Sequence, residues 1–284
     1  MVGNVIVGQS GGPTSVINSS LVGVYKTAKD RGANKVYGML HGIKGLLDGQ
    51  YVDLSEHIKT TLDIDLLKRT PSSFLGSCRY KLPEICDNKE VYEQIFAKLK
   101  ELEISAFFYI GGNDSMDTIK KLSDYAILIN SDIKFMGVPK TIDNDLAITD
   151  HTPGYGSAAK FIAASLKEII RDGLVYDYPT ITIVEIMGRN AGWLTAAAAL
   201  SRSDDCEGVD MIYLPEKVFD IADFMEQVKK RSATGKSLVI AVSEGIKVAD
   251  GRYVFELADH VEFVDAFGHK QLAGSAKFLA DKIG

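Results

Sequence analysis

The chain has 284 residues, enough for two α/β lobes that each bury a core of their own. Its formal net charge of −6 argues against broad nucleic-acid binding, because an acidic chain lacks the basic surface that meets a phosphate backbone. The sequence contains no apolar run of about eighteen residues, the length needed to span a membrane, and no signal-peptide pattern. The three cysteines follow neither a disulfide nor a metal-site spacing. We therefore expect a cytoplasmic protein with reduced thiols.

Apolar runs typical of buried strands alternate with stretches of helical periodicity along most of the chain. We expect strands at residues 5–7, 35–39, 106–110, 134–138, 180–186, 211–214 and 237–242, and helices at 15–30, 88–101, from about 115, 158–171, 221–231 and 267–283. Residues 41–47 and 70–79 are punctuated by glycine or polar side chains and are expected to be irregular. The alternation predicts mainly parallel sheets with helices on both faces.

Glycine-rich loops follow two of the predicted strands. The first is Gly8-Gln9-Ser10-Gly11-Gly12-Pro13-Thr14, and the second is Gly111-Gly112-Asn113-Asp114-Ser115. Paired glycines let a backbone pass close to a phosphate, and a helix that starts near Ser115 would point its amino end there. Neither loop is the dinucleotide fingerprint G-x-G-x-x-G or a P-loop, so a nicotinamide-binding protein is excluded.

A third polar segment, Pro139-Lys140-Thr141-Ile142-Asp143-Asn144-Asp145, comes directly after the strand predicted at 134–138. Open α/β sheets place their ligands at such carboxyl ends. Two carboxylates so close together are compatible when one holds Mg²⁺ and the other accepts a proton. A solvated turn would use the same residue types, so this segment alone leaves both interpretations open.

The three segments together resemble the phosphofructokinase family, and the resemblance extends from Val5 to about Glu244. It implies a phosphofructokinase fold of two Rossmann-like lobes. Residues 1–140 would form the phosphoryl-donor lobe, residues 141–265 the sugar-phosphate lobe, and residues 266–284 a return helix toward the first lobe. The implied reaction is a reversible, Mg²⁺-dependent phosphoryl transfer to the 1-hydroxyl of fructose 6-phosphate.

The resemblance also implies roles for individual residues. Asp143 would be the base that takes the proton from the sugar hydroxyl, and Asp145 with Asn113 would organise Mg²⁺. The donor and the transferred phosphoryl group would be held by Arg79, Lys140, Thr141, Gly11, Gly12, Gly112, Asn113, Asp114 and Ser115. The acceptor sugar would be held by Met187, Gly188, Arg189 and Glu244.

Two positions bear on the identity of the donor. ATP-using members carry glycine where this chain has Asp114, and glycine where it has Lys140. An aspartate would repel the α-phosphate of a nucleotide, whereas a lysine can reach the end of a short donor as a point charge. Both residues favour pyrophosphate, with ATP as the alternative. His41 and Lys44 fall in a segment that the family places over the donor site, and a solvated loop explains them equally well.

Other positions depart from the family pattern. Asn113 replaces a carboxylate near the metal, and Thr180 replaces an arginine that reaches a neighbouring subunit in many members. Family members also continue past residue 284 with further cations for the sugar 6-phosphate, so we expect weak fructose 6-phosphate binding by this chain. A non-catalytic sugar-phosphate-binding homologue is therefore a second hypothesis. A homo-oligomer, either a dimer or a tetramer, is the expected assembly.

Overall fold

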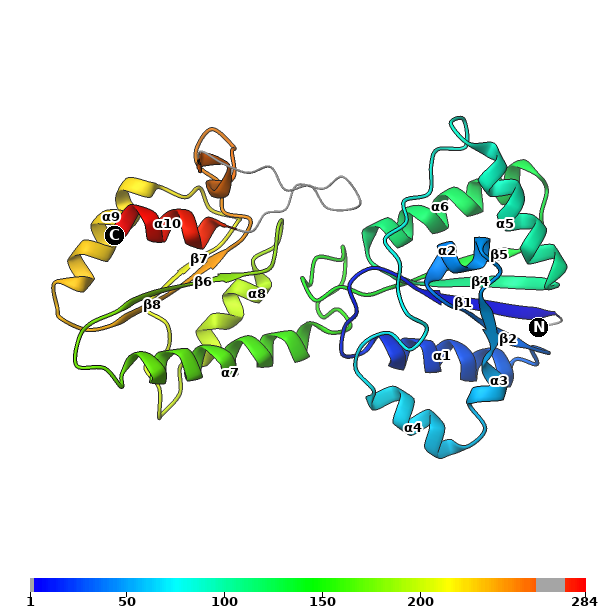
Figure 1. Ribbon diagram of the computed structural model, residues 1–284, viewed down its shortest axis with the longest axis horizontal. Helices are drawn as coiled ribbons and strands as arrows, with labels where there is room; N and C mark the ends of the chain where they lie inside the picture. Colours follow the sequence, from blue (N-terminus) through cyan, green and yellow to red (C-terminus); the bar gives the residue numbers. More distant parts are fainter. Residues whose placement is uncertain (1–2, 259–273) are drawn as a thin grey trace. The chain divides into compact units, whose positions relative to one another are not determined.

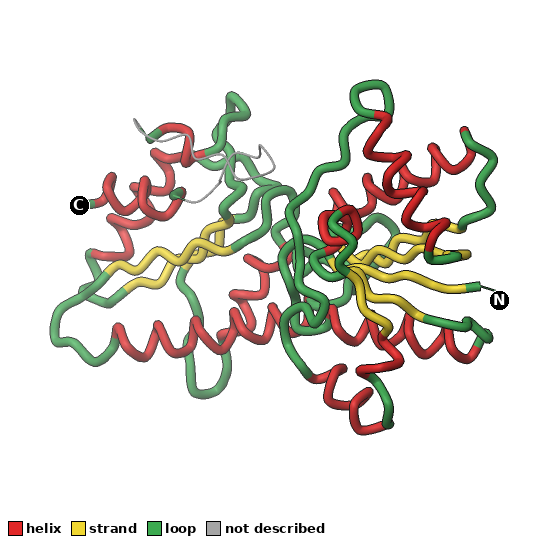
Figure 2. Tube along the Cα trace, turned by 45° about the vertical axis from the view of Figure 1, so that its right-hand side comes forward, coloured by secondary structure: helices red, strands yellow, loops and turns green. Residues whose placement is uncertain are grey.

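The computed structural model describes residues 3–258 and 274–284, and the chain divides into two compact units, Met1–Thr141 and Ile142–Gly284. Each unit has its own sheet, and helices lie on both sides of the strands (Figures 1 and 2). The α/β architecture predicted from the alternation of strands and helices is confirmed.

The sheet of the first unit has five strands in the order β3-β2-β1-β4-β5. Their bounds are Asn4–Gln9 for β1, Val36–Met39 for β2, Tyr51–Asp53 for β3, Ile104–Gly111 for β4 and Lys134–Pro139 for β5. The edge strand β3 is antiparallel to β2, and the other pairs are parallel. The carboxyl ends of β1, β4 and β5 therefore meet at one edge of the sheet.

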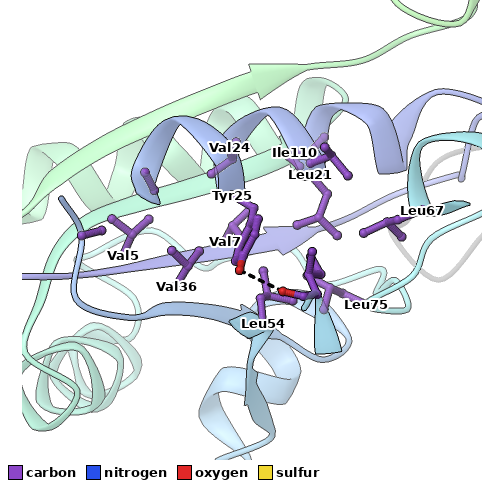
Figure 3. Close-up of a cluster of buried hydrophobic side chains, with 14 of the residues drawn as sticks. Val5, Val7, Leu21, Val24, Tyr25, Val36, Leu54, Leu67, Leu75 and Ile110 are labelled. Carbon is purple, nitrogen blue, oxygen red and sulfur yellow. Dashed lines mark hydrogen bonds between the residues drawn. The ribbon is translucent and has the colours of Figure 1, made fainter. Parts of the chain in front are cut away.

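Helices cover both faces of this sheet. They are α1 (Ile17–Asp30), α2 (Gly42–Leu47), α3 (Leu54–His57), α4 (Thr61–Arg69), α5 (Lys89–Glu101) and α6 (Asn113–Leu128). Because side chains alternate along a strand, Val5 and Val7 of β1 belong to the buried cluster that contains Leu21 of α1 (Figure 3), whereas Ile6 faces the cluster that contains Tyr92 of α5. The central strand is thus buried on both faces.

Part of the first unit differs from the prediction. Residues 42–47, expected to be a glycine-punctuated loop, form the helix α2. The reason is close packing, because a Cβ atom on Gly45 would lie 1.5 Å from the carbonyl oxygen of Leu40. Gly45 therefore lets the helix sit against the preceding chain. The short elements β3, α3 and α4 also went unpredicted, since none has a long periodic pattern.

The second unit has three parallel strands in the order β6-β8-β7. Their bounds are Ile181–Ile186 for β6, Met211–Tyr213 for β7 and Leu238–Ser243 for β8. The helices are α7 (Tyr155–Gly173), α8 (Trp193–Ala196), η1 (Ala197–Ser201), α9 (Ile221–Ser232), η2 (Val254–Leu257) and α10 (Ser275–Ile283). The central strand β8 is buried along its whole length, with Ile240 in one core cluster and Ala241 in the other.

The last helix packs differently from the expectation that it would return to the first lobe. Leu279 of α10 is fully buried in a core cluster of the second unit, and Phe278 packs against the same cluster. Amphipathic periodicity shows that a helix needs an apolar partner but does not say which one. Residues 266–273 of the predicted return segment lie outside the described residues. Within the described part of the chain, no helix is long and apolar enough to cross a membrane.

Candidate active site

Backbone hydrogen bonds join the three strand ends of the first unit. The amide of Ser10, just past β1, donates to the carbonyl of Ile110 on β4 at 2.9 Å, and the amide of Lys140, just past β5, donates to the carbonyl of Gly111 at 2.9 Å. The two glycine loops and Lys140 are therefore neighbours along one edge, as expected where parallel strands end together. We call this edge, made of residues 10–12, 111–115 and 140, the donor edge.

Lys140 links two of the loops through its side chain. It is 7% exposed, and its ammonium group donates to the carbonyl of Gly12. The position of a Cβ atom on Gly11, which has a φ of +76°, lies 3.5 Å from the lysine Nζ atom. The ammonium group of Lys140, buried beside Gly11 and Gly12, therefore gives the donor edge a positive charge.

The amino end of α6 completes the donor edge. Gly112 is the N-cap, no side chain caps the helix, and Asp114 lies in the first turn. Such an end presents backbone N–H groups that favour an anion. The sterically demanding glycine is Gly111, because a Cβ atom there would lie 1.9 Å from Oγ of Ser115, whereas one on Gly112 would meet the Lys140 carbonyl at an ordinary 3.8 Å.

The segment that carries Arg79 is fastened to the first glycine loop. The amide of Gly11 donates to the carbonyl of Cys78 at 3.3 Å, the Ser77 hydroxyl donates to the carbonyl of Gly11 at 2.6 Å, and the Ser10 hydroxyl contacts the Cys78 carbonyl at 3.4 Å. Arg79 is the next residue, so the chain delivers it beside the donor edge although it is far away in the sequence.

A buried amide pair that the sequence analysis missed holds the start of this segment. Gln9 and Asn18 are almost fully buried, and Nε2 of Gln9 donates to Oδ1 of Asn18 at 3.0 Å. Oε1 of Gln9 accepts from the Ser73 hydroxyl and the Leu75 amide, both at 2.9 Å, and Nδ2 of Asn18 donates to the Thr70 carbonyl at 2.8 Å. Satisfied buried networks of this kind specify one arrangement. No clear signal in the sequence marks this pair, because Gln9 adjoins Ser10 and Asn18 adjoins Ser19.

A polar cavity of about 410 Å³ opens beside Arg79. Its lining includes the basic side chains of His41, Lys44 and Arg79. The sequence did not decide whether His41 and Lys44 belong to a donor-site loop or to a solvated loop. The structure places both in one cavity with Arg79. Behind the cavity, the buried Tyr109 contacts Cys78, and its hydroxyl accepts from the Ile43 amide at 3.3 Å; burial raises the pKa of this tyrosine.

The two candidate carboxylates begin the second unit, whereas Lys140 and Thr141 end the first. Three peptide units separate Lys140 from Asp143, so their Cα atoms lie within about 11 Å of each other whatever the conformation. Between the carboxylates, Asn144 is 5% exposed and has a left-handed φ of 59°, which asparagine tolerates better than most residues. Asp143 is half-buried and Asp145 is exposed.

The Asn144 amide closes the loop that holds these carboxylates. Its Nδ2 donates to the Asp150 carbonyl at 3.1 Å, and its Oδ1 accepts from the Thr152 amide at 2.8 Å. Asparagine at this position therefore has a structural role that the sequence analysis did not assign. The loop presents Asp143 and Asp145 from a fixed turn, as the turn propensity of such residues allows.

Oxygen donors at this loop suit Mg²⁺. Among residues 3–258 and 274–284, no group of three or more His, Cys, Asp or Glu side chains could enclose a metal. Mg²⁺ is usually bound by one or two carboxylates together with substrate phosphates and waters, so Asp145, the carboxylate expected to hold the metal, fits it without such a cage. Asn113, the other expected metal neighbour, lies on the first unit, at the start of α6.

The expected sugar-binding residues of the second unit follow the neighbouring strands β6 and β8. The amide of Gly188 donates to Oε1 of Glu244 at 3.1 Å, and the hydroxyl of Ser243 donates to the carbonyl of Gly188 at 2.7 Å. Gly188 has a φ of +132°, which favours glycine. The structure therefore brings Met187, Gly188 and Glu244 into one loop pair, which we call the acceptor edge.

Arg189 belongs to the same acceptor edge. A Cβ atom on Gly245 would lie 2.1 Å from the carbonyl oxygen of Arg189, so only glycine lets the two loops approach so closely. Met187 is 57% exposed, in keeping with a residue at the rim. The glycine that follows Glu244 in the sequence indicates this close contact between the loops, but the sequence analysis did not use it.

The fold and these strand-end loops define a class, α/β proteins with glycine-lined edges suited to a phosphate-bearing ligand. The phosphofructokinase family model matches residues 4–283, and the chain belongs to the phosphofructokinase family. It is 43% identical to the pyrophosphate–fructose 6-phosphate 1-phosphotransferase of Rhodospirillum rubrum, with 99% of this chain and 67% of the relative covered. The Xanthomonas campestris pv. campestris protein of that name is 41% identical, with 99% and 66% covered.

A solved structure gives the same result. The pyrophosphate-dependent phosphofructokinase from Nitrosospira multiformis matches with a TM-score of 0.81 and 34% identity, covering 99% of this chain and 65% of that one. The family resemblance read from the three loops is confirmed. The chain spans about two thirds of the length of the curated relatives that it matches.

Proposed function

We propose that the protein transfers a phosphoryl group from pyrophosphate to the 1-hydroxyl of fructose 6-phosphate, giving fructose 1,6-bisphosphate and phosphate. The observation that carries this proposal is the donor edge, where Lys140 is buried against the first glycine loop and Asp114 lies in the first turn of α6. The names of four relatives that match 99% of this chain agree with that activity.

The donor edge favours a short donor over a nucleotide. Lys140 places a positive charge beside Gly12, where a terminal phosphate can approach the backbone amides. Asp114 adds a negative charge at the helix end, which opposes the additional phosphate and nucleoside of ATP. Pyrophosphate has neither the additional phosphate nor the nucleoside. ATP is the alternative donor, and it would require room and a neutral surface where Asp114 stands.

Phosphoryl transfer depends mainly on positioning and on charge stabilisation. Asp143 takes the proton from the 1-hydroxyl while the sugar oxygen bonds to the phosphorus, and the bond to the departing phosphate breaks. Arg79, Lys140 and Thr141 hold the charge that gathers on the phosphoryl oxygens. Mg²⁺, when bound by Asp145 and the phosphates with Asn113 as neighbour, would neutralise part of that charge.

The acceptor edge would hold the sugar phosphate. Arg189 supplies a cation, and the Met187–Gly188 backbone lies next to Glu244. A glutamate that accepts a hydrogen bond from a sugar hydroxyl discriminates against sugars that lack this hydroxyl. Glu244 already accepts a hydrogen bond from the Gly188 amide, and in this role it would also accept one from the acceptor sugar.

The cellular setting belongs to the same proposal. We expect a cytoplasmic homo-oligomer, and the three cysteines, Cys78, Cys86 and Cys206, are all free thiols, which suits a reducing compartment. Sedimentation velocity of the purified chain would test the assembly, and a single monomeric species would contradict the dimer or tetramer.

A coupled aldolase assay tests the function directly. The purified 284-residue chain is supplied with fructose 6-phosphate and Mg²⁺, and with pyrophosphate or ATP at equal concentration. Because weak fructose 6-phosphate binding is expected, the sugar phosphate is supplied in large excess, and we then expect turnover with pyrophosphate and loss of that turnover when Mg²⁺ is removed by a chelator. Faster turnover with ATP would contradict the donor assignment. Fructose 6-phosphate binding without turnover from either donor would instead favour the non-catalytic homologue.

A further inference from the structure

A buried lysine in the middle of α6 has no role in the proposed chemistry. Lys121 is 8% exposed, and its ammonium group contacts three oxygens. It donates to the Leu82 carbonyl at 3.0 Å, to Oε1 of Glu84 at 2.8 Å and to Oδ2 of Asp117 at 2.9 Å. An ammonium group has three protons, so its hydrogen-bonding capacity is filled.

Two of these oxygens belong to the segment that follows Arg79. Residues 76–88 contain neither helix nor strand, so contacts with other parts of the first unit help to fix their path. Leu82 is 1% exposed within a core cluster, and the buried Tyr92 donates its hydroxyl to the carbonyl of Pro83 at 2.6 Å. Lys121 and Tyr92 together anchor the segment three to five residues beyond Arg79.

The upstream side of Arg79 is anchored separately. The carbonyl of Cys78 accepts from the amide of Gly11, as described above. Arg79 therefore lies between one anchor on the first glycine loop and a second on α6. Since α6 also begins at the donor edge, with Asn113 as its first residue, Lys121 ties the arginine segment to the helix that presents the second glycine loop.

The charge of Lys121 is maintained in this environment. Burial alone would lower the pKa of its ammonium group, but the hydrogen bonds to Glu84 and Asp117 outweigh that effect and raise the pKa above its usual value. Both carboxylates are themselves more than two fifths exposed, so water can solvate them if the lysine is removed. Removal should therefore release the segment without leaving buried charges.

We propose that Lys121 is a positioning residue for Arg79 in the phosphoryl-transfer reaction. The proposal rests on the proposed function, because it assigns Arg79 to the transferred phosphoryl group. Displacing a catalytic group by about 1 Å can cost on the order of a hundredfold in rate. An anchor a few residues from Arg79 is close enough to cause such a displacement, whereas the neighbouring Lys120 is exposed.

A double-mutant cycle tests the coupling. Lys121→Met is measured in the parent chain and in an Arg79→Ala background, with Lys120→Met as the matched control on the same helix. We expect Lys121→Met to lower kcat with pyrophosphate by about tenfold or more in the parent, and by less than about twofold when Arg79 is already absent. Lys120→Met should change neither. Equal losses in both backgrounds, or no loss in the parent, would overturn the proposal.

Further measurements keep the result independent of folding and of the proposed function. Lys121→Arg preserves the charge and should recover most of the lost kcat, and melting curves check that each variant is folded. Hydrogen exchange requires no activity: Lys121→Met should speed amide exchange in residues 79–84 relative to Lys120→Met. Unchanged exchange there would refute the anchor even if turnover were absent, while absent turnover in the parent would refute only the proposed function.

Discussion

The donor edge and the acceptor edge are built in different ways. Three parallel strands end at the donor edge, and two long-range networks, one around Gln9 and one around Lys121, hold the irregular segment that carries Arg79. The acceptor edge follows two neighbouring strands, and Glu244 itself joins the loops through the Gly188 amide. At the first edge the segment of Arg79 is held by residues other than Arg79, whereas at the second edge one carboxylate both joins the loops and is assigned to the sugar.

This difference predicts different responses to mutation. The side chain of Arg79 can be removed without loosening its segment, since that segment is held by Gln9 and Lys121. At the acceptor side, a change in the residue that binds the sugar also changes the loop. We therefore expect some donor-edge variants to lose turnover without losing stability, whereas a change of Glu244 at the acceptor edge should affect both.

The largest effect is expected at Asp143. Asp143→Ser should lower kcat with pyrophosphate by roughly 10²–10⁴-fold, as expected for the loss of a general base. Affinity for pyrophosphate should change far less, because the donor edge lies within the first unit. Steady-state kinetics at saturating substrates provide the measurement, and Asp150→Ser, an exposed carboxylate of the same loop, is the control. Turnover within threefold of the parent would show that another group is the base.

The second effect concerns the donor pair. Asp114→Gly combined with Lys140→Gly should raise the ratio of kcat/KM for ATP to that for pyrophosphate by about tenfold or more, a change of about 1.4 kcal/mol. Removal of Asp114 should act first, because it removes both bulk and negative charge from the end of α6. Initial rates with each donor measure the ratio. An unchanged ratio would mean that these residues do not select the donor.

The third prediction tests the double role of Glu244. Glu244→Ala should raise the KM for fructose 6-phosphate and also destabilise the second unit by about 1–3 kcal/mol, because the Gly188 amide loses its acceptor. Glu244→Gln keeps an oxygen for that amide, so it should weaken sugar binding while leaving stability nearly unchanged. Denaturant unfolding and kinetics are compared for both. Equal stability of Glu244→Ala and the parent would refute the double role.

The sequence was most informative where a pattern is local. The glycine loops, the carboxylate segment and the strands before them are contiguous, so their placement at strand ends followed from their order. The two anchors of the Arg79 segment were invisible because they join distant residues. Gln9 contacts Ser73, 64 positions away, and Lys121 contacts Leu82, 39 positions away. The polar side chains involved show no spacing that reveals their partners.

The same limit explains the helices that were misjudged. In α2, Gly45, which looked like a loop residue, allows close packing against Leu40. In α10, the apolar face that contains Leu279 was evident, but its partner in the second unit was not. Local propensity gives the type of element, and tertiary contacts decide the rest.

The most direct test of the account is a binding measurement at the donor edge. Isothermal titration of the 284-residue chain in the presence of Mg²⁺ compares pyrophosphate with a non-hydrolysable ATP analogue, for the parent and for Lys140→Met, with Lys134→Met as an exposed control on β5. The account predicts that pyrophosphate binds more tightly than the analogue and that only Lys140→Met weakens it, by about tenfold or more. Tighter binding of the analogue, or unchanged pyrophosphate affinity in Lys140→Met, would contradict it.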